Sequence, residues 1–426
     1  MITKNGGELL KDFSDRTYQE KFLEVVPGIW HISGVGHSNV TVIEGNTSVI
    51  LIDTLDTLER GQRVLAFIQE KIGKAVNTVI YTHGHPDHRG GAGAFSAGSP
   101  EIIAFQPKIP MLARTEELME IQGLRGSRQF GYDLTDEENI SQGIGRREGM
   151  VYGEHRAFVP PTTLYGQDKV ERRIDGVSVE LVRVPGETAD QILVWLPEKK
   201  VLCCGDNYYG CFPNLYAIRG RQYRDIATWL DSLEALKAYP AEYLLPGHTA
   251  PIFGNEKIQE VLGNFKDAIN FILTETLQGM NQGKTCDRLA AEIKLPERYA
   301  ELPYMAEHYG CVEWSVRAIY TAYLGWFDGN PSSLHPLAPE KRAEKEIAMM
   351  GGGESVLQAA KKAREGQEYQ WCLELCDKLM ECGGKEGREA GFLKAEALLE
   401  IAEYETSANG RHYYISCAKE LLAHKK

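Results

Sequence analysis

The sequence predicts an α/β domain followed by an all-α domain. Short apolar runs of strand length alternate with amphipathic helical segments through residues 1–262. Helical segments fill residues 263–426, with glycine and proline between them. The third observation is a run of metal-binding side chains directly after one apolar strand near residue 80. We therefore expect a catalytic domain over 1–262 and a helical domain over 263–426.

Three strands are expected at the start of the α/β domain, over residues 29–33, 39–44 and 48–53. Gly34-Val35-Gly36 and Gly45-Asn46 separate them, as turns separate the strands of a meander. The last strand ends at Asp53, which is either a plain strand-ending carboxylate or a support for the metal run. Residues 58–72 have helical periodicity and lead into the next strand.

The metal-binding run follows the expected strand 78–82. His83 and His85 are two residues apart, so an extended segment directs both rings to one side, and Asp87 and His88 follow in the loop. A surface loop with chance histidines is the alternative, but the chain has only 11 His in 426 residues. Imidazole and carboxylate without thiolate suit zinc or another first-row divalent ion. The density of ligands favours two adjacent ions over one.

The pattern weakens between Gly91 and Asp168, where we expect a long insert. An insert of this length is usually functional, as a lid or a pocket wall. It carries basic and aromatic residues that could face a substrate, namely Arg125, Arg128, Tyr132, Tyr152 and Tyr165.

Further strands are expected over 177–184, 192–196, 201–204 and 243–245, and a helix over 225–239. Three of these strands deliver one metal-competent side chain each at their ends, namely Glu187, Asp206 and His248. Each would be unremarkable alone. Together with the run at 83–88 they supply seven ligand side chains, which is too many for one tetrahedral ion.

Composition excludes several classes of protein. The formal net charge of -13 argues against a nucleic-acid partner. The first 12 residues contain several charged residues and no apolar segment, and no run of 18 apolar residues occurs, so we expect neither a secretion signal nor a membrane partner. A cytoplasmic protein is the resulting expectation.

The helical domain is expected to serve packing and self-association. Helices are predicted over 265–278, 286–293, 315–324, 355–365, 371–380, 389–404 and 413–422, the last four as two antiparallel pairs. Aromatic residues gather around the third of these helices and are typical of interface cores, although they could fill the domain's own core: Trp314, Tyr320, Tyr323, Trp326 and Phe327. We expect a symmetric homodimer through this domain.

The run His-x-His-x-Asp-His followed by Gly-Gly resembles the signature of the metallo-β-lactamase superfamily. The resemblance implies an αββα sandwich and hydrolysis with one or two metal ions. It also implies a ligand set, in which His83, His85 and Glu187 hold one ion, and Asp87, His88 and His248 hold the other. Asp206 would bridge the two ions, and Asp53 would support the ligands from behind. Most members of the superfamily have His where Glu187 stands.

Two further segments resemble the alkyl sulfatases of that superfamily. They are Asn214-Leu215-Tyr216 with Arg219-Gly220, and the distinctive run from Tyr323 to Pro331. The resemblance implies that Asn214 and Arg219 bind sulfate and that the second run belongs to a dimerisation domain. The family has Glu where Glu187 stands but usually bridges its metals with Glu in place of Asp206. The sequence ends at Lys426, where longer members continue into a domain resembling sterol carrier proteins; without it we expect substrates other than long-chain surfactants.

These resemblances predict a dinuclear metallohydrolase, a sulfuric ester hydrolase that cleaves alkyl sulfate monoesters to alcohol and sulfate. Two divalent ions, with zinc expected, would activate water as a metal-bound hydroxide, and no catalytic side chain beyond that water is expected. The charges of two divalent ions, three carboxylates and a hydroxide nearly cancel, so Arg219 would be needed to attract the sulfate. The first alternative is a hydrolase of the same fold acting on another ester, a lactone or a thioester. The second is a non-hydrolytic diiron oxidoreductase or an inactive metal-binding scaffold.

Overall fold

The computed structural model describes residues 5–109 and 112–423. The chain divides into two compact units. We call Asp12–Met119 with Ser141–Tyr323 the sandwich unit, and Met1–Lys11, Glu120–Ile140 and Leu324–Lys426 the helical unit. The expected domain limit at residues 262 and 263 falls inside α7 (Asn255–Asn281), one unbroken helix. The compact units do not define domains in the sense of protein families. The predicted catalytic domain over 1–262 and helical domain over 263–426 stay a prediction.

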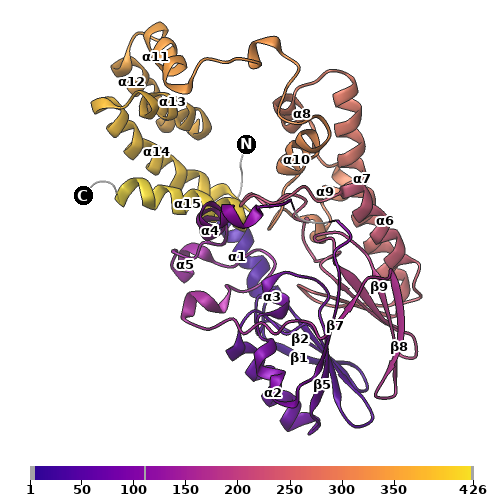
Figure 1. Cartoon of the computed structure of the whole chain (residues 1–426). Coiled ribbons are helices and arrows are strands. Elements are labelled where there is room, and N and C mark those ends of the chain that lie inside the picture. The colour runs from indigo at the N-terminus through magenta and orange to yellow at the C-terminus, as the bar shows by residue number, and fades with distance from the viewer. Residues whose placement is uncertain (1–4, 110–111, 424–426) are drawn as a thin grey trace. The chain divides into compact units, whose positions relative to one another are not determined.

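The sandwich unit is built on two β-sheets (Figure 1). The seven strands of the first sheet lie in chain order: β1 (Lys21–Val26), β2 (Ile29–Ser33), β3 (Val40–Glu44), β4 (Val49–Ile52), β5 (Val76–Ile80), β6 (Glu101–Phe105) and β7 (Thr163–Tyr165). The six strands of the second sheet lie in reverse order from β13 to β8: β8 (Lys169–Ile174), β9 (Val177–Arg183), β10 (Ile192–Leu196), β11 (Val201–Gly205), β12 (Tyr243–Pro246) and β13 (Ile252–Phe253).

Alternation along the strands explains why the two sheets stack. On β4, Ile50 and Ile52 belong to a core shared with the second sheet, whereas Val49 and Leu51 belong to a core with α2 (Leu58–Lys71). On β10, Ile192 and Val194 join the shared core, whereas Leu193 and Trp195 pack with α6 (Ile226–Lys237) and α7. Because both faces of β4 and β10 are buried, helices must cover the outer faces of the sheets there. The result is the αββα sandwich that the sequence predicted (Figure 1).

Parallel pairing at the middle of each sheet positions the candidate metal ligands. In the first sheet β5 runs parallel to β4 and β6, and in the second sheet β11 runs parallel to β12. Parallel strands end at the same edge of a sheet. The segments that follow β4, β5, β11 and β12 therefore gather at one edge of the sandwich, and these segments carry Asp53, the run His83–His88, Asp206 and His248.

The strands expected around the metal-binding run are confirmed, with limits shifted by one or two residues. The expected strand 78–82 is β5 at Val76–Ile80, so Tyr81 and Thr82 already lie in the loop. No strand was predicted in the long insert, but β6 and β7 lie within it and extend the first sheet. β1 was also missed, although it pairs along its length with β2. Short or half-exposed strands such as β7 give little periodicity, and pairing with a neighbour decides them.

Shorter helices complete the sandwich unit. They are α3 (Pro86–Arg89), α8 (Cys286–Glu292), α9 (Glu297–Ala300) and α10 (Val312–Leu324), with 3₁₀ turns at Ala92–Gly98, Thr115–Leu118, Gly149–Tyr152 and Pro303–Met305. α7 begins ten residues before the helix expected at 265–278. Its buried residues Ile258, Leu262 and Phe265 continue the apolar face that packs with the second sheet.

The helical unit has its own apolar core. The four helices predicted in its second half are confirmed as α12 (Gly353–Glu365), α13 (Tyr369–Cys382), α14 (Gly384–Tyr404) and α15 (Ala408–Ala423), preceded by a 3₁₀ turn (Pro331–Ser333) and α11 (Pro339–Met349). The insert contributes α4 (Met119–Phe130) and α5 (Asp136–Asn139). The first part of α1 (Gly6–Thr17), up to Lys11, also belongs to this unit. Buried His412 of α15 lies 3.0 Å from the carbonyl of Gln129 and 2.8 Å from that of Asn139. Arg128 of the insert also pairs with Glu420, so its side chain has a structural partner.

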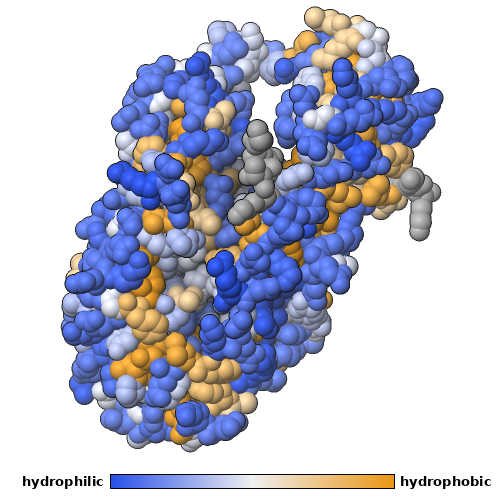
Figure 2. All heavy atoms as spheres, turned by 180° about the vertical axis from the view of Figure 1, so that it is seen from behind, coloured by the Kyte–Doolittle hydropathy of each residue, from blue (hydrophilic) through white to orange (hydrophobic). Residues whose placement is uncertain are grey.

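The surface is mostly hydrophilic on the face shown in Figure 2, with apolar residues in separate patches. Among the described residues, no helix combines the length and the apolar character that a membrane span requires.

The turn between β8 and β9 generates a prediction about acid stability. Asp175 lies in the left-handed region (φ 45°) and accepts hydrogen bonds from the backbone N–H groups of Thr47 and Ser48, in the β3–β4 turn of the other sheet. The Thr47 N–H, followed by the Ser48 hydroxyl and N–H, lowers the pKa of Asp175 to about 2. A carboxylate whose pKa is lowered by folding stabilises the protein above its unfolded pKa, and this contribution is lost as the pH falls through the folded pKa.

We therefore expect Asp175→Ala to lower the melting temperature at neutral pH. The difference from the wild type should shrink as the pH falls from about 5 to about 2. Thermal unfolding across this range measures it, with exposed Asp231→Ala as the control. A difference between wild type and variant that stays constant over the range would contradict the assignment.

Candidate metal centre

All seven predicted ligand side chains lie together at one edge of the sandwich. His83 and His85 follow β5, and Asp87 and His88 lie on the short helix α3. Glu187, Asp206 and His248 follow β9, β11 and β12. All of them except Asp87 and His85 are at least nine-tenths buried.

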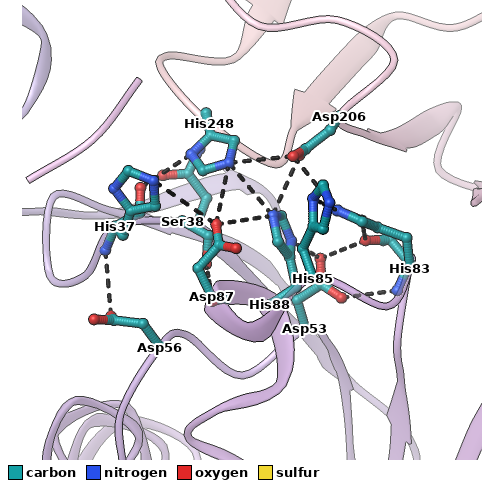
Figure 3. A network of polar contacts seen from close by, with 12 residues as sticks. His37, Ser38, Asp53, Asp56, His83, His85, Asp87, His88, Asp206 and His248 are labelled. Atoms are coloured by element: carbon teal, nitrogen blue, oxygen red, sulfur yellow. Dashed lines mark hydrogen bonds and ion pairs between the residues drawn. The ribbon is translucent and has the colours of Figure 1, made fainter. Parts of the chain in front are cut away.

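One set of ligand atoms converges on a single point. The carboxylate Oδ2 of Asp87 lies 3.3 Å from His88 Nε2 and 3.4 Å from His248 Nε2, and the two imidazole nitrogens are 3.4 Å apart. Figure 3 shows these three side chains pointing toward one another. They are the residues that the resemblance assigned to one ion.

The other set lies beside it. His83 Nε2 is 3.0 Å from His85 Nδ1, and ligand atoms of His85, Glu187 and Asp206 lie within 4.8 Å of one another. Asp206 stands between the two sets, because its Oδ1 lies 3.3 Å from His88 Nε2 and its Oδ2 lies 3.5 Å from His83 Nε2 and 3.3 Å from His248 Nε2. This is the position that a bridging carboxylate requires.

The hydrogen bonds behind three imidazoles fix which nitrogen carries the proton. His88 Nδ1 donates to Asp53 at 2.8 Å, and His248 Nδ1 donates to the carbonyl of His37 at 3.0 Å. Thr82 donates its hydroxyl proton to Asp53, so His83 Nδ1 is the donor in its 3.0 Å contact with the Thr82 oxygen. Each ring then presents the lone pair of Nε2 to the centre, as a metal ligand must. The donor set therefore fits two divalent ions.

Asp53 contacts the candidate ligands from behind, in agreement with the supporting role that the resemblance implies. It lies in the left-handed region (φ 62°), and one oxygen accepts from His88 Nδ1 and the Thr82 hydroxyl while the other accepts from the Thr82 N–H. Asp53 thereby orients His88 directly and His83 through Thr82. Supports of this kind raise the basicity of the ligands they hold.

The carboxylates of the site favour positive charge on the groups next to them. Burial opposes the imidazolium forms, but Asp206 and Asp87 outweigh it and raise the pKa of His88, and that of His248 to about 10. Burial likewise opposes ionisation of Asp206, yet His88 and His248 hold its pKa well below the ordinary range. Burial raises the pKa of Glu187 to about 7, although Arg224 opposes this shift. A cation at the centre satisfies the same carboxylates.

His37 was missed by the sequence analysis. Its Nδ1 donates to the carbonyl of Arg146 at 2.9 Å, and its Nε2 lies 4.0 Å from the Asp87 carboxylate. Its backbone N–H reaches Asp56 Oδ1 at 3.3 Å, and its carbonyl holds His248 (Figure 3). A single histidine in a turn of Gly and Ser has no spacing that marks it. Only the approach of the turn to His248, more than 200 residues later, gives it a place in the network.

Arg224 was also missed. Its guanidinium lies 2.6 Å from Glu187 Oε1 and also donates to the backbone carbonyl of Asn214, and its side chain is buried. Arg224 therefore links a predicted metal ligand to a predicted sulfate-binding residue. The other Glu187 oxygen, Oε2, is buried without a hydrogen-bond partner among the described residues. A cation beside Oε2 accounts for a Glu187 side chain that Arg224 holds at one oxygen and that has no partner at the other.

The predicted sulfate residues lie near the centre in different ways. Asn214 is fully buried, and neither atom of its side-chain amide has a hydrogen-bond partner among the described residues. The pKa of His85 is lowered by burial first, then by the charges of His83 and Arg224, and in part by Arg219, which places Arg219 close to the ligands. None of the five insert residues singled out in the sequence lines the cavity next to the ligands.

The fold and the ligand set define a metallo-β-lactamase protein, and family models agree. The model described as metallo-beta-lactamase superfamily matches residues 33–248, and the model described as alkyl sulfatase dimerisation matches residues 285–424. Glu187, in the position where most of the superfamily has His, agrees with the second match.

Individual relatives narrow the family. The chain is 33% identical to a linear primary-alkylsulfatase of a Pseudomonas species over 89% of this chain and 73% of that protein. It is 31% identical to an alkyl/aryl-sulfatase of Saccharomyces cerevisiae, over 93% of this chain and 63% of that protein. The solved structure of an inverting sec-alkylsulfatase from Pseudomonas matches with a TM-score of 0.85 and 27% identity, over 98% of this chain and 67% of that one. The chain belongs to the alkyl sulfatase family, and it spans between 60% and 73% of the length of the curated alkyl sulfatases it matches.

The link between Arg224 and Glu187 generates a prediction about metal binding. Without the guanidinium, Glu187 loses the group that orients it, and partners of this kind usually contribute a factor of 10–100 to metal affinity. We expect Arg224→Met to lower the affinity for one of two bound ions by about that factor and to leave the other ion in place. Competition with a chromophoric chelator measures both affinities.

Arg183→Met is the matched control. Arg183 is a buried arginine of the same unit, with a carboxylate partner in Asp168 and backbone carbonyl partners. It lies outside the ligand set, so both ions should bind Arg183→Met with wild-type affinity. Unchanged metal affinity in Arg224→Met would remove Arg224 from the support of Glu187.

Proposed function

We propose that the chain is a metal-dependent hydrolase that cleaves alkyl sulfate monoesters to alcohol and sulfate. The observation that carries the proposal is Asp206 with imidazole nitrogens on both sides, beside a Glu187 that Arg224 holds. Membership of the alkyl sulfatase family and the dimerisation match support the same activity.

Two zinc ions per chain fit the ligands best. The seven side chains offer imidazole nitrogen and carboxylate oxygen without thiolate, which suits zinc among the abundant divalent ions. When bound, such ions lower the pKa of a water nucleophile and neutralise charge on the ester oxygens.

The chain's own residues would hold the sulfate. The buried amide of Asn214 is available to donate to a sulfate oxygen, and Arg224 fixes the backbone of Asn214 through its carbonyl. Arg219, whose charge reaches His85, would supply a charge-assisted pair. Burial of the centre excludes bulk water and strengthens each of these contacts.

The proposal predicts about two metal ions per chain at saturation. Removal of metal by a chelator should abolish sulfate release, and zinc should restore it. Elemental analysis of wild-type protein and of Asp206→Ala measures the stoichiometry, and the variant should lose at least one ion. If the wild-type protein binds only one metal ion per chain at saturation, the bridging role of Asp206 is wrong.

Arg219 gives the prediction that separates a sulfatase from other hydrolases of the fold. A charge-assisted hydrogen bond contributes about 1.5–3 kcal/mol, so Arg219→Ala should lower kcat/KM for a sulfate ester about ten- to a hundredfold or more. A neutral ester, if it is hydrolysed, should be affected far less. Sulfate release, hydrolysis of the neutral ester and thermal melting are measured in parallel.

Equal losses on both esters together with a lower melting temperature would identify Arg219 as a structural residue. In that case the proposal reduces to a hydrolase of another ester, a lactone or a thioester.

We also propose that the chain forms a homodimer through its dimerisation region. The aromatic residues expected there differ in exposure: Tyr320 is 4% exposed and packs in its own core, whereas Tyr323 is 48% and Trp326 is 74% exposed. Further apolar side chains are exposed along the same stretch, namely Leu324, Leu334, Leu337 and Met349. Aromatic and apolar residues of this kind are typical of interface cores.

Light scattering should therefore report twice the chain mass, and Trp326→Glu should shift the protein toward the monomer. A wild-type protein that stays monomeric at all accessible concentrations would contradict the dimer.

A further inference from the structure

A cavity of about 440 Å³ lies against the candidate metal centre. Both His85 and Glu187 line it, so a molecule in the cavity reaches the ligands directly. Part of its wall is apolar, from Pro86, Pro107, Ile109 and Pro185, and this part suits methylene groups. The wall also carries three arginines and three carboxylates, namely Arg89, Arg221, Arg224, Glu187, Asp190 and Asp225.

Two of the three carboxylates that line the cavity are already engaged. Glu187 forms its ion pair with Arg224, which also lines the cavity. Asp225 caps α6, where it accepts from the N–H groups of Ala227 and Thr228 and from the Thr228 hydroxyl. Glu187 therefore matches the charge of Arg224, and the Asp225 carboxylate is directed at the first turn of α6.

Arg221 is the first of these cations. Its side chain is exposed in the cavity wall, and within the described residues it has neither a hydrogen bond nor an ion pair within 4.0 Å. Loss of hydration and the nearby guanidinium groups of Arg219 and Arg224 lower its pKa. Arg221 therefore lies beside other guanidinium groups and has no ion-pair partner of its own among the described residues.

Arg89 is the second cation. Its guanidinium stacks 4.5 Å from the ring centre of Phe158, and it too has no carboxylate partner in the described part of the chain. The third carboxylate of the wall, Asp190, lies against the backbone of Gly84, where an added Cβ would be 3.0 Å from its Oδ2. Its negative charge is thus at the ligand end of the cavity, beside the run His83–His88.

We propose that the alcohol part of the substrate carries a second anionic group, a carboxylate, which Arg221 binds while Arg89 adds to the attraction. The inference rests on the proposed sulfatase activity and names the substrate class of the same cavity: sulfate esters of hydroxycarboxylic acids. The sulfate occupies the metal end, the methylene groups lie along the prolines and Ile109, and the carboxylate lies at Arg221. The planar guanidinium matches a carboxylate in two parallel hydrogen bonds, which an uncharged alkyl terminus cannot make.

The test compares two esters of equal chain length, hexyl sulfate and 6-(sulfooxy)hexanoate, with the metal-loaded, full-length protein. We expect kcat/KM to be at least tenfold higher for the carboxylated ester, and the preference to shrink as salt is added, because added salt screens exposed charges. Arg221→Gln should reduce the ratio of the two kcat/KM values about tenfold. Since Arg221 is exposed, the melting temperature of the Arg221→Gln variant should equal that of the wild type.

Arg173→Gln is the matched control, because Arg173 is an exposed arginine of the same unit on β8 that does not line the cavity. Its ratio of kcat/KM values should equal that of the wild type. Binding of both esters is measured by calorimetry in parallel, so that selectivity is decided even for a protein without turnover.

The outcomes separate the two proposals. Sulfate release from both esters at equal kcat/KM, or an equal loss on both in Arg221→Gln, overturns the carboxylate site and leaves the sulfatase activity standing. Preferential binding of the carboxylated ester without sulfate release supports the carboxylate site and overturns the activity. If the protein neither releases sulfate nor binds the carboxylated ester preferentially, both proposals are overturned.

Discussion

The structure depends on one buried carboxylate, Asp206, which lies within 3.5 Å of three imidazole nitrogens. The imidazoles follow β5 in one sheet and β12 in the other, or lie on α3, so the arrangement exists only if the two sheets stack with these strand ends at one edge. Burial of Asp206 is tolerable because positive charge surrounds it, either as protonated imidazole or as metal ion. The candidate metal centre is thus a consequence of how the two sheets stack.

Groups behind the ligands determine which atoms they present. Asp53 and Thr82 orient His88 and His83, and the carbonyl of His37 orients His248. Arg224 does the same for Glu187 and extends the network to Asn214. A glutamate that is paired with arginine differs from a histidine in charge and in reach. In this chain Glu187 is therefore held by a residue more than 30 positions later in the sequence.

Positively charged side chains gather at the site, although the net charge of the chain is negative. The protein is acidic overall, yet Arg89, Arg221 and Arg224 line the cavity beside the candidate metal ligands. Glu187 and Asp225 have partners of their own, and among the described residues neither forms an ion pair with Arg89 or Arg221. Local field, rather than net charge, is what an anionic substrate meets.

The sequence by itself determined the strand ends and the family, and it predicted seven candidate ligand side chains, because these depend on local spacing and on motifs. It also predicted most strands of the two sheets and the helices of the C-terminal half. It missed β6 and β7, whose short runs become strands only by pairing with their neighbours. It also missed His37 and Arg224. Both act through contacts with residues remote in sequence or across loops, and no spacing records such contacts. Only the tertiary structure decided which nitrogen each imidazole presents, and which carboxylates and arginines of the cavity have partners among the described residues.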